Sequence, residues 1–85
     1  MSPIEHQEGL FKIYIWPDEG GGKGKEAPHV HVFTPDAEVK IGLNPVRIIG
    51  STRMREPDRR RALAIVKAQA TKLMTAWRKW HEAQD

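Results

Sequence analysis

The spacing of the apolar residues changes at Pro57, and this change most constrains the fold. Before Pro57, apolar and polar residues alternate in short segments, which is the pattern of half-buried β-strands. After it, the chain runs to Ala83 without a glycine or a second proline, and apolar residues recur every three or four positions. Proline fits the first turn of a helix, and Asp58 fits the positive end of the helix dipole. The sequence therefore predicts strands followed by one long C-terminal helix.

The predicted helix has an apolar stripe that covers about one third of its circumference. Its members are Leu63, Val66, Ala70, Leu73, Trp77 and Trp80. A helix from Asp58 to Ala83 would be ~39 Å long, whereas a globule of this length has a diameter of ~30 Å. We therefore expect the helix end, with Trp77 and Trp80, to extend beyond the domain. Exposed indoles there predict packing against a second copy of the chain, as a homo-oligomer, or against a partner protein.

Four segments before Pro57 have the alternation of strands. They are residues 10–16, 29–34, 37–43 and 46–49. Proline, aspartate, asparagine and glycine residues separate them, as expected for turns. Residues 2–9 have no periodicity and predict a frayed lead-in or a short edge segment. The predicted fold class is α+β, a small curved antiparallel sheet of about four strands packed by one long C-terminal helix (β-β-β-β-α).

A chain of 85 residues predicts one small domain, residues 1–85. It has no cysteine, so its stability must come from packing or from association with another chain. No apolar run approaches the ~20 residues of a membrane span, and the first residues lack the basic and apolar regions of a signal peptide. We expect a cytoplasmic protein that contacts no membrane.

The net charge of +3 is unevenly distributed. Residues 1–52 carry five Lys/Arg against seven Asp/Glu, whereas residues 53–85 carry nine against four. From Arg53 to Lys79 the only acids are two residues near the start of the predicted helix. This bias points to an anionic partner, RNA or DNA, with a solvated helix face as the alternative. The candidate nucleic-acid-binding residues are Arg53, Arg55, Arg60, Arg61, Lys67, Lys72, Arg78 and Lys79. Without interleaved aromatic residues, we expect phosphate-directed and sequence-tolerant binding.

The run Pro28-His29-Val30-His31-Val32 contains two histidines two positions apart within a strand-like segment. Alternation along a strand puts His29 and His31 on one face, ~7 Å apart along the strand. Two imidazoles suit general acid and base catalysis of RNA cleavage, with the basic helix beside them to hold the phosphate. His29 and His31 are therefore the candidate catalytic residues. The alternative is a structural pair, with rings packed beside Phe33 or Trp16 and nitrogens hydrogen-bonded to backbone or water.

No metal and no cofactor are predicted. Zinc requires three or four ligands, and only His6, His81 and carboxylates such as Glu26 are available to join the histidine pair. The glycine-rich residues 20–25 lack the Gly-x-x-x-x-Gly-Lys-Ser/Thr pattern of a phosphate-binding loop, and no helix pattern follows them. A flexible connector is the better interpretation of this segment.

Two stretches carry a resemblance to a known family: residues 27–32, Ala-Pro-His-Val-His-Val, and residues 62–69, Ala-Leu-Ala-Ile-Val-Lys-Ala-Gln, with Leu73 and Trp77 following. The chain resembles, from about Leu10 to His81, the small bacterial family catalogued as domain of unknown function 4160. The resemblance implies an aromatic-rich first strand, a Pro-His-x-His-Val strand, two further strands and a C-terminal helix. It also implies a toxin/antitoxin-associated role, because family members often occur in such gene pairs.

The resemblance supplies no established catalytic residue. Many members have an Asp-His or similar pair just before the motif, where this chain has residues 25–27, Lys-Glu-Ala. The leading hypothesis is a small bacterial protein that binds or acts on RNA or DNA through its basic C-terminal helix, with His29 and His31 as the functional pair. The alternative is a non-enzymatic protein-protein interaction module whose histidines are structural.

Overall fold

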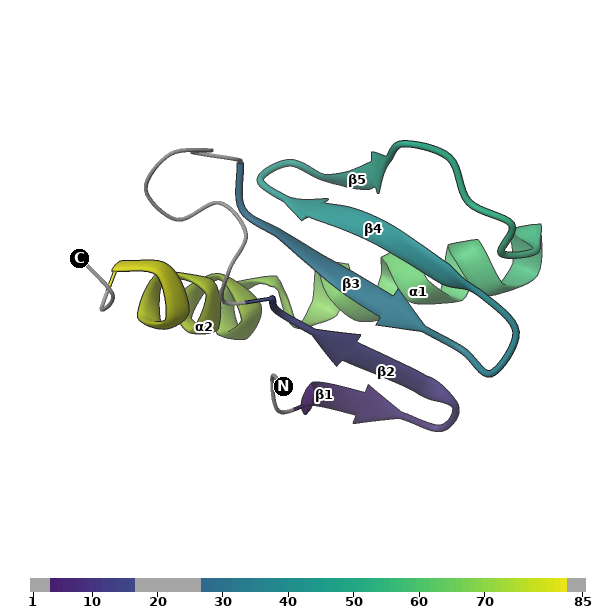
Figure 1. Ribbon diagram of the computed structural model, residues 1–85, viewed down its shortest axis with the longest axis horizontal. Helices are drawn as coiled ribbons and strands as arrows, with labels where there is room; N and C mark the ends of the chain where they lie inside the picture. Colours follow the sequence, from purple (N-terminus) through teal and green to yellow (C-terminus); the bar gives the residue numbers. More distant parts are fainter. Residues whose placement is uncertain (1–3, 17–26, 83–85) are drawn as a thin grey trace.

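Five strands and two helices make up the part of the chain that the structure, a computed structural model, describes: residues 4–16 and 27–82, with side chains up to residue 79. The strands are β1 (Ile4–Glu8), β2 (Phe11–Tyr14), β3 (His29–Phe33), β4 (Glu38–Leu43) and β5 (Val46–Ile49), and the helices are α1 (Glu56–Ala68) and α2 (Ala70–Glu82). The strands lie in chain order, each antiparallel to its neighbours. Figure 1 shows α1 behind the sheet and α2 continuing toward the side where β2 ends and β3 begins.

The α+β class and the antiparallel sheet are confirmed, but the sheet has five strands among the described residues rather than about four. The four predicted segments correspond to β2, β3, β4 and β5. The additional strand, β1, bears out the short edge segment rather than the frayed lead-in. Its pairing register with β2 shifts between Ile4 and His6, so its side chains do not alternate regularly. Gly9 closes the β1–β2 turn with a φ of 57°, which a residue with a side chain rarely adopts.

The core lies between the sheet and the helices. Val30 and Val32 of β3 face the helices, with Ile41 and Val39 opposite them on β4 and Ile13 on β2. The helices cover this layer with buried apolar residues. They are Ala62, Ile65 and Val66 of α1 and Leu73 and Trp77 of α2. The buried apolar residues of β2, β3 and β4 thus lie on the side of the sheet that the helices cover.

The prediction of one uninterrupted helix is wrong, because the helix is divided at Gln69. The Gln69 N–H is shared between the carbonyls of Ile65, at 3.0 Å, and Val66, at 3.2 Å. Its φ of −105° and ψ of 13° depart from helical values. No glycine or proline stands at this position, so the local sequence carries no signal for the break.

The predicted exposure of Trp77 is also wrong. The Trp77 side chain is only 6% exposed, and its ring centroid lies 5.0 Å from that of His29. A buried indole is not available to a second subunit, so the basis for an oligomer contact through Trp77 is lost. The side chains of Trp80 and His81, together with the glycine-rich connector and Glu26, lie outside the described residues.

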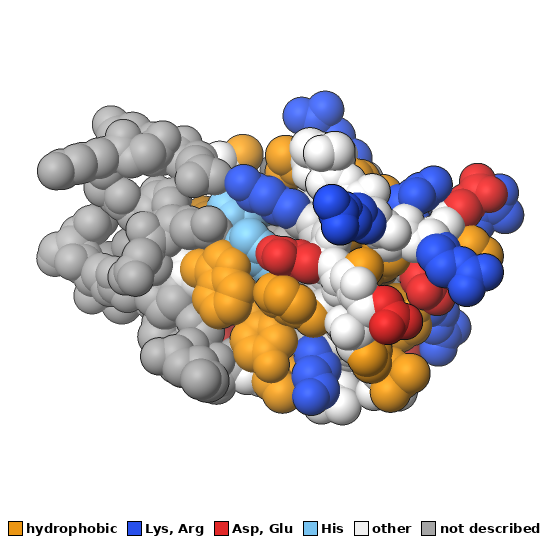
Figure 2. Space-filling view, turned by 45° about the vertical axis from the view of Figure 1, so that its right-hand side comes forward, with side chains coloured by type: hydrophobic (Ala, Val, Ile, Leu, Met, Phe, Trp, Pro, Cys, Tyr) orange, Lys and Arg blue, Asp and Glu red, His pale blue; other side chains and the backbone are white. Residues whose placement is uncertain are grey.

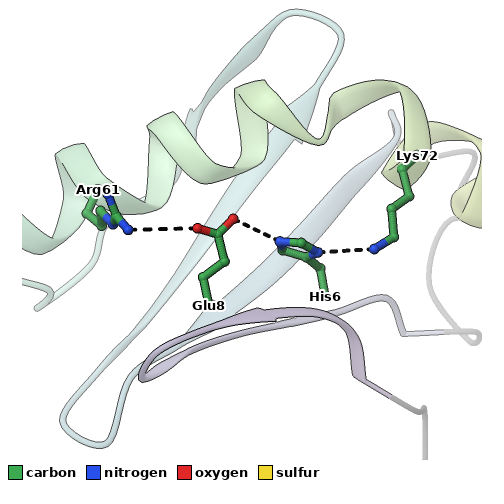
Figure 3. Close-up of polar contacts among 4 residues, drawn as sticks. All are labelled: His6, Glu8, Arg61 and Lys72. Carbon is green, nitrogen blue, oxygen red and sulfur yellow. Dashed lines mark hydrogen bonds and ion pairs between the residues drawn. The ribbon is translucent and has the colours of Figure 1, made fainter.

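Polar contacts connect the edge strand β1 to both helices (Figure 3). Glu8 Oε1 lies 3.8 Å from Arg61 Nη2 on α1, and Glu8 Oε2 lies 2.9 Å from His6 Nε2. Lys72 Nζ on α2 lies 3.1 Å from His6 Nδ1. Because a lysine ammonium only donates, we assign His6 Nδ1 as the acceptor and Nε2–H as the donor to Glu8. The carboxylate thus links both helices to β1, directly to α1 and through His6 to α2.

We predict that Glu8→Gln lowers the free energy of unfolding by about 0.5–1 kcal/mol, since the ion pairs that it weakens are partly exposed. Urea denaturation measures the loss, and hydrogen exchange should show faster opening of β1 than of β4. The matched control is Asp36→Asn, which removes a charge from the β3–β4 turn. An equal loss in both variants would contradict a specific role for Glu8.

Candidate functional site

Six aromatic rings contact one another across β2, β3 and α2. We call them the aromatic cluster: Tyr14, Trp16, His29, His31, Phe33 and Trp77. Tyr14 lies opposite His31 in the β2–β3 register, so both stand on the sheet face turned away from α1, which we call the outer face. The His29 and His31 ring centroids are 5.3 Å apart. Figure 2 shows histidine atoms on the surface beside hydrophobic side chains and an acidic group.

His31 is held by a carboxylate. Its Nδ1 lies 2.8 Å from Glu38 Oε2, and Glu38 stands on the same face of the neighbouring strand β4. The carboxylate accepts, so Nδ1 carries the hydrogen. A carboxylate that orients an imidazole in this way is found in catalytic triads and behind metal-ligating histidines. The sequence singled out no partner for His31, although alternation along residues 37–43 puts Glu38 on the polar face of that strand, where pairing of the two strands would bring it close.

His29 is buried more completely and bonded to the backbone. Its side chain is 1% exposed, and Nδ1 lies 3.0 Å from the Ala27 carbonyl oxygen. The ring lies between those of His31 and Trp77, 5.3 and 5.0 Å from them. His31, at 6% exposed, contacts Trp16 with ring centroids 5.1 Å apart. Packed rings and bonded nitrogens are the features expected of structural histidines.

The described residues hold no group of three or more His, Cys, Asp or Glu side chains that could bind a metal ion. Both Nδ1 atoms of the histidine pair are engaged in hydrogen bonds. His6 contacts Glu8 and Lys72 at the edge strand instead.

All eight predicted cationic residues are exposed. We call this set the basic surface: Arg53, Arg55, Arg60, Arg61, Lys67, Lys72, Arg78 and Lys79. Three of them have partners within the chain, since Arg60 pairs with Glu56 at 3.4 Å, Arg61 with Glu8 and Lys72 with His6. The other five make no ion pair with the described residues.

The catalytic hypothesis required basic helical residues beside the histidine pair. The structure does not bring the basic residues of α1 there. The sheet and its apolar core lie between α1 and the outer face that carries His31 and Glu38. The cations of the outer face come instead from the strands. Lys12 lies opposite Phe33, and Lys40 lies opposite His31. Sequence reasoning overlooked both lysines, although their place in the alternation puts them on the face of the histidines.

We predict that His29→Gln lowers the free energy of unfolding by about 1–3 kcal/mol, because the change disturbs a buried and hydrogen-bonded polar group. Thermal or urea denaturation followed by tryptophan fluorescence measures the loss and reports the altered surroundings of Trp77. His6→Gln is the matched control and should cost less, because His6 lies on an edge strand and is only half-buried. A larger loss for His6→Gln would contradict the assignment.

Comparison with known families agrees with the resemblance seen in the sequence. Residues 10–78 match the family model described as Domain of unknown function (DUF4160). No curated protein and no solved structure matches the chain. No described helix has the length and apolar character needed to cross a membrane. The matched residues include the whole aromatic cluster and leave out β1. The family model matches most of the length of the chain, so the chain belongs to the DUF4160 family.

Proposed function

We propose that this protein binds RNA or DNA through its basic surface. The observation that carries the proposal is that all eight predicted cations are exposed, while the stretch from Arg53 to Lys79 contains only Glu56 and Asp58 as acids. Such an excess of cations raises the local concentration of a polyanion and favours contacts with phosphates.

The distribution of partners identifies the cations most available to phosphates. Lys67, Arg78 and Lys79 are exposed on the helices and form no ion pair with another described residue. The first turn of α1 carries Glu56 and Asp58, which disfavour a phosphate at that helix end. Side-chain ammonium and guanidinium groups therefore supply the contacts. Binding of this kind reads the backbone of the nucleic acid rather than its bases.

The double variant Lys67→Gln/Arg78→Gln should weaken binding to RNA and DNA about tenfold or more at low salt. It should also reduce the slope of log K against log salt by about 1.5, since two phosphate contacts are lost. Fluorescence anisotropy with labelled duplex and single strands between about 50 and 200 mM salt measures both.

The matched control is Lys40→Gln/Arg47→Gln, which removes the same charge from the sheet. If the control weakens binding as much as the helical variant, the effect is one of net charge and the basic surface is only solvated. Circular dichroism of both variants checks that the helices remain folded.

The arrangement of the histidines favours a binding module over an enzyme. Both imidazoles are buried, both Nδ1 atoms are bonded, and the cations of α1 lie across the sheet from them. The observation that favours the alternative, RNA cleavage by His29 and His31, is the Glu38 carboxylate that orients His31 as a base.

We expect no RNA cleavage by the wild-type protein between about pH 5 and 8, the range in which an imidazole pair would work. Gel analysis of a labelled RNA incubated with purified protein measures this. Cleavage that disappears in His31→Gln and in Glu38→Gln, with folding retained, would make the pair catalytic and contradict the structural assignment.

The toxin/antitoxin association implied by family resemblance remains a prediction, as do a cognate partner protein and a homo-oligomer. Co-purification with the product of the neighbouring gene tests the first two. Sedimentation tests the homo-oligomer, whose contact would have to use a surface other than Trp77.

A further inference from the structure

The outer face of the sheet is hollowed beside β1, β2 and β3. The groove has a volume of about 740 Å³, within the range of small-molecule sites. Its described lining includes the side chains of Gln7, Lys12, Tyr14, Trp16, Phe33 and Thr34. Leu10, at 67% exposed, stands at its border. Figure 2 shows hydrophobic side chains gathered on this part of the surface.

Aromatic rings form the wall of the groove. The Tyr14 and Trp16 rings are stacked, with centroids 5.6 Å apart and planes at 19°. Phe33 meets Tyr14 edge-on at 5.4 Å and Trp16 edge-on at 6.1 Å. All three side chains are half-buried, so part of each remains accessible. Nearly parallel rings at a groove are a platform on which a further planar ring can stack.

The charge among the described lining residues of the groove is positive. Lys12 is exposed and is the one charged side chain among the described residues that line it. Gln7 and Thr34 add polar groups at the same surface. The lining therefore suits a ligand that has a planar apolar ring and, on the side of Lys12, a negatively charged group. A nucleotide combines these two features in one molecule.

We propose that this groove is a nucleotide-binding site, in which the base stacks on the Tyr14–Trp16 pair and the phosphate pairs with Lys12. The nucleotide is either free or part of a single strand, since both present the same chemistry. The site lies on the outer face, away from the cations of α1, so its existence does not depend on nucleic-acid binding by the basic surface.

The histidine pair has a positioning role in this proposal. His31 contacts Trp16 at 5.1 Å and is itself held by Glu38 at 2.8 Å. His29 links His31 to Trp77 on α2. The buried imidazoles thus fix the indole that forms one wall, rather than contacting the ligand.

Titration with the four nucleoside monophosphates and with a short single strand, followed by quenching of tryptophan fluorescence, tests the proposal. Saturable quenching by a monophosphate indicates a site for free nucleotides. Quenching by the single strand alone indicates a site that reads unpaired bases when it persists in Lys67→Gln/Arg78→Gln, because the basic surface can also bind a single strand. Either result supports the proposal. No saturable quenching up to about 5 mM, a concentration that fills even a millimolar site, would overturn it.

Two variants locate the site. Tyr14→Leu removes the stacking ring but keeps an apolar side chain, and it should raise the Kd about tenfold or more. Lys12→Gln changes an exposed side chain, retains the fold and should weaken binding of the monophosphates. An unchanged Kd for the monophosphates in Lys12→Gln would overturn the assignment of the site. This test does not depend on whether Tyr14→Leu folds.

Duplex DNA separates this site from the basic surface, because paired bases cannot enter the groove. Tyr14→Leu should leave duplex binding unchanged, and Lys67→Gln/Arg78→Gln should leave monophosphate binding unchanged. A Tyr14→Leu variant that loses duplex and monophosphate binding equally would contradict two separate sites.

Discussion

Burial of β3 on both faces is the constraint on which the rest of the structure depends. One face, with Val30 and Val32, is apolar and needs only the helices to cover it. The other face carries His29 and His31, whose polar nitrogens cannot be buried without partners. The Ala27 carbonyl and the Glu38 carboxylate supply them. A histidine strand in the middle of the sheet is therefore stable only with β4 in its observed register.

The same constraint explains the position of α2. Once the helix is interrupted at Gln69, Leu73 and Trp77 are both buried, and the Trp77 indole contacts the His29 ring. Burying a large indole gains hydrophobic stabilisation that an overhanging helix would forgo. The edge strand β1 pairs with β2 in the sheet, and polar contacts of His6 and Glu8 link it to the helices. These contacts are partly exposed, so each adds less stability than the packing at the centre of the fold.

These arrangements leave two surfaces with different chemistry. The helices expose cations, and the outer face of the sheet exposes aromatic rings with the Lys12 ammonium beside them. The histidine pair packs against these rings, because His31 contacts Trp16 and His29 contacts His31. The Nδ1 atoms of the two histidines bond to the Ala27 carbonyl and the Glu38 carboxylate, so the motif is part of the packing of the sheet.

The sequence by itself determined the α+β class, the segments that form β2 to β5, and the exposure of the basic residues. These follow from local periodicity, which reports which side of an element is apolar. Only the tertiary structure decided that β1 joins the sheet, that the helix breaks at Gln69 and that Trp77 turns inward. It also decided that Glu38 meets His31 and that the sheet separates the histidines from the cations of α1. Those outcomes depend on contacts between residues distant in the chain, and no local pattern records which distant side chains fill the same space.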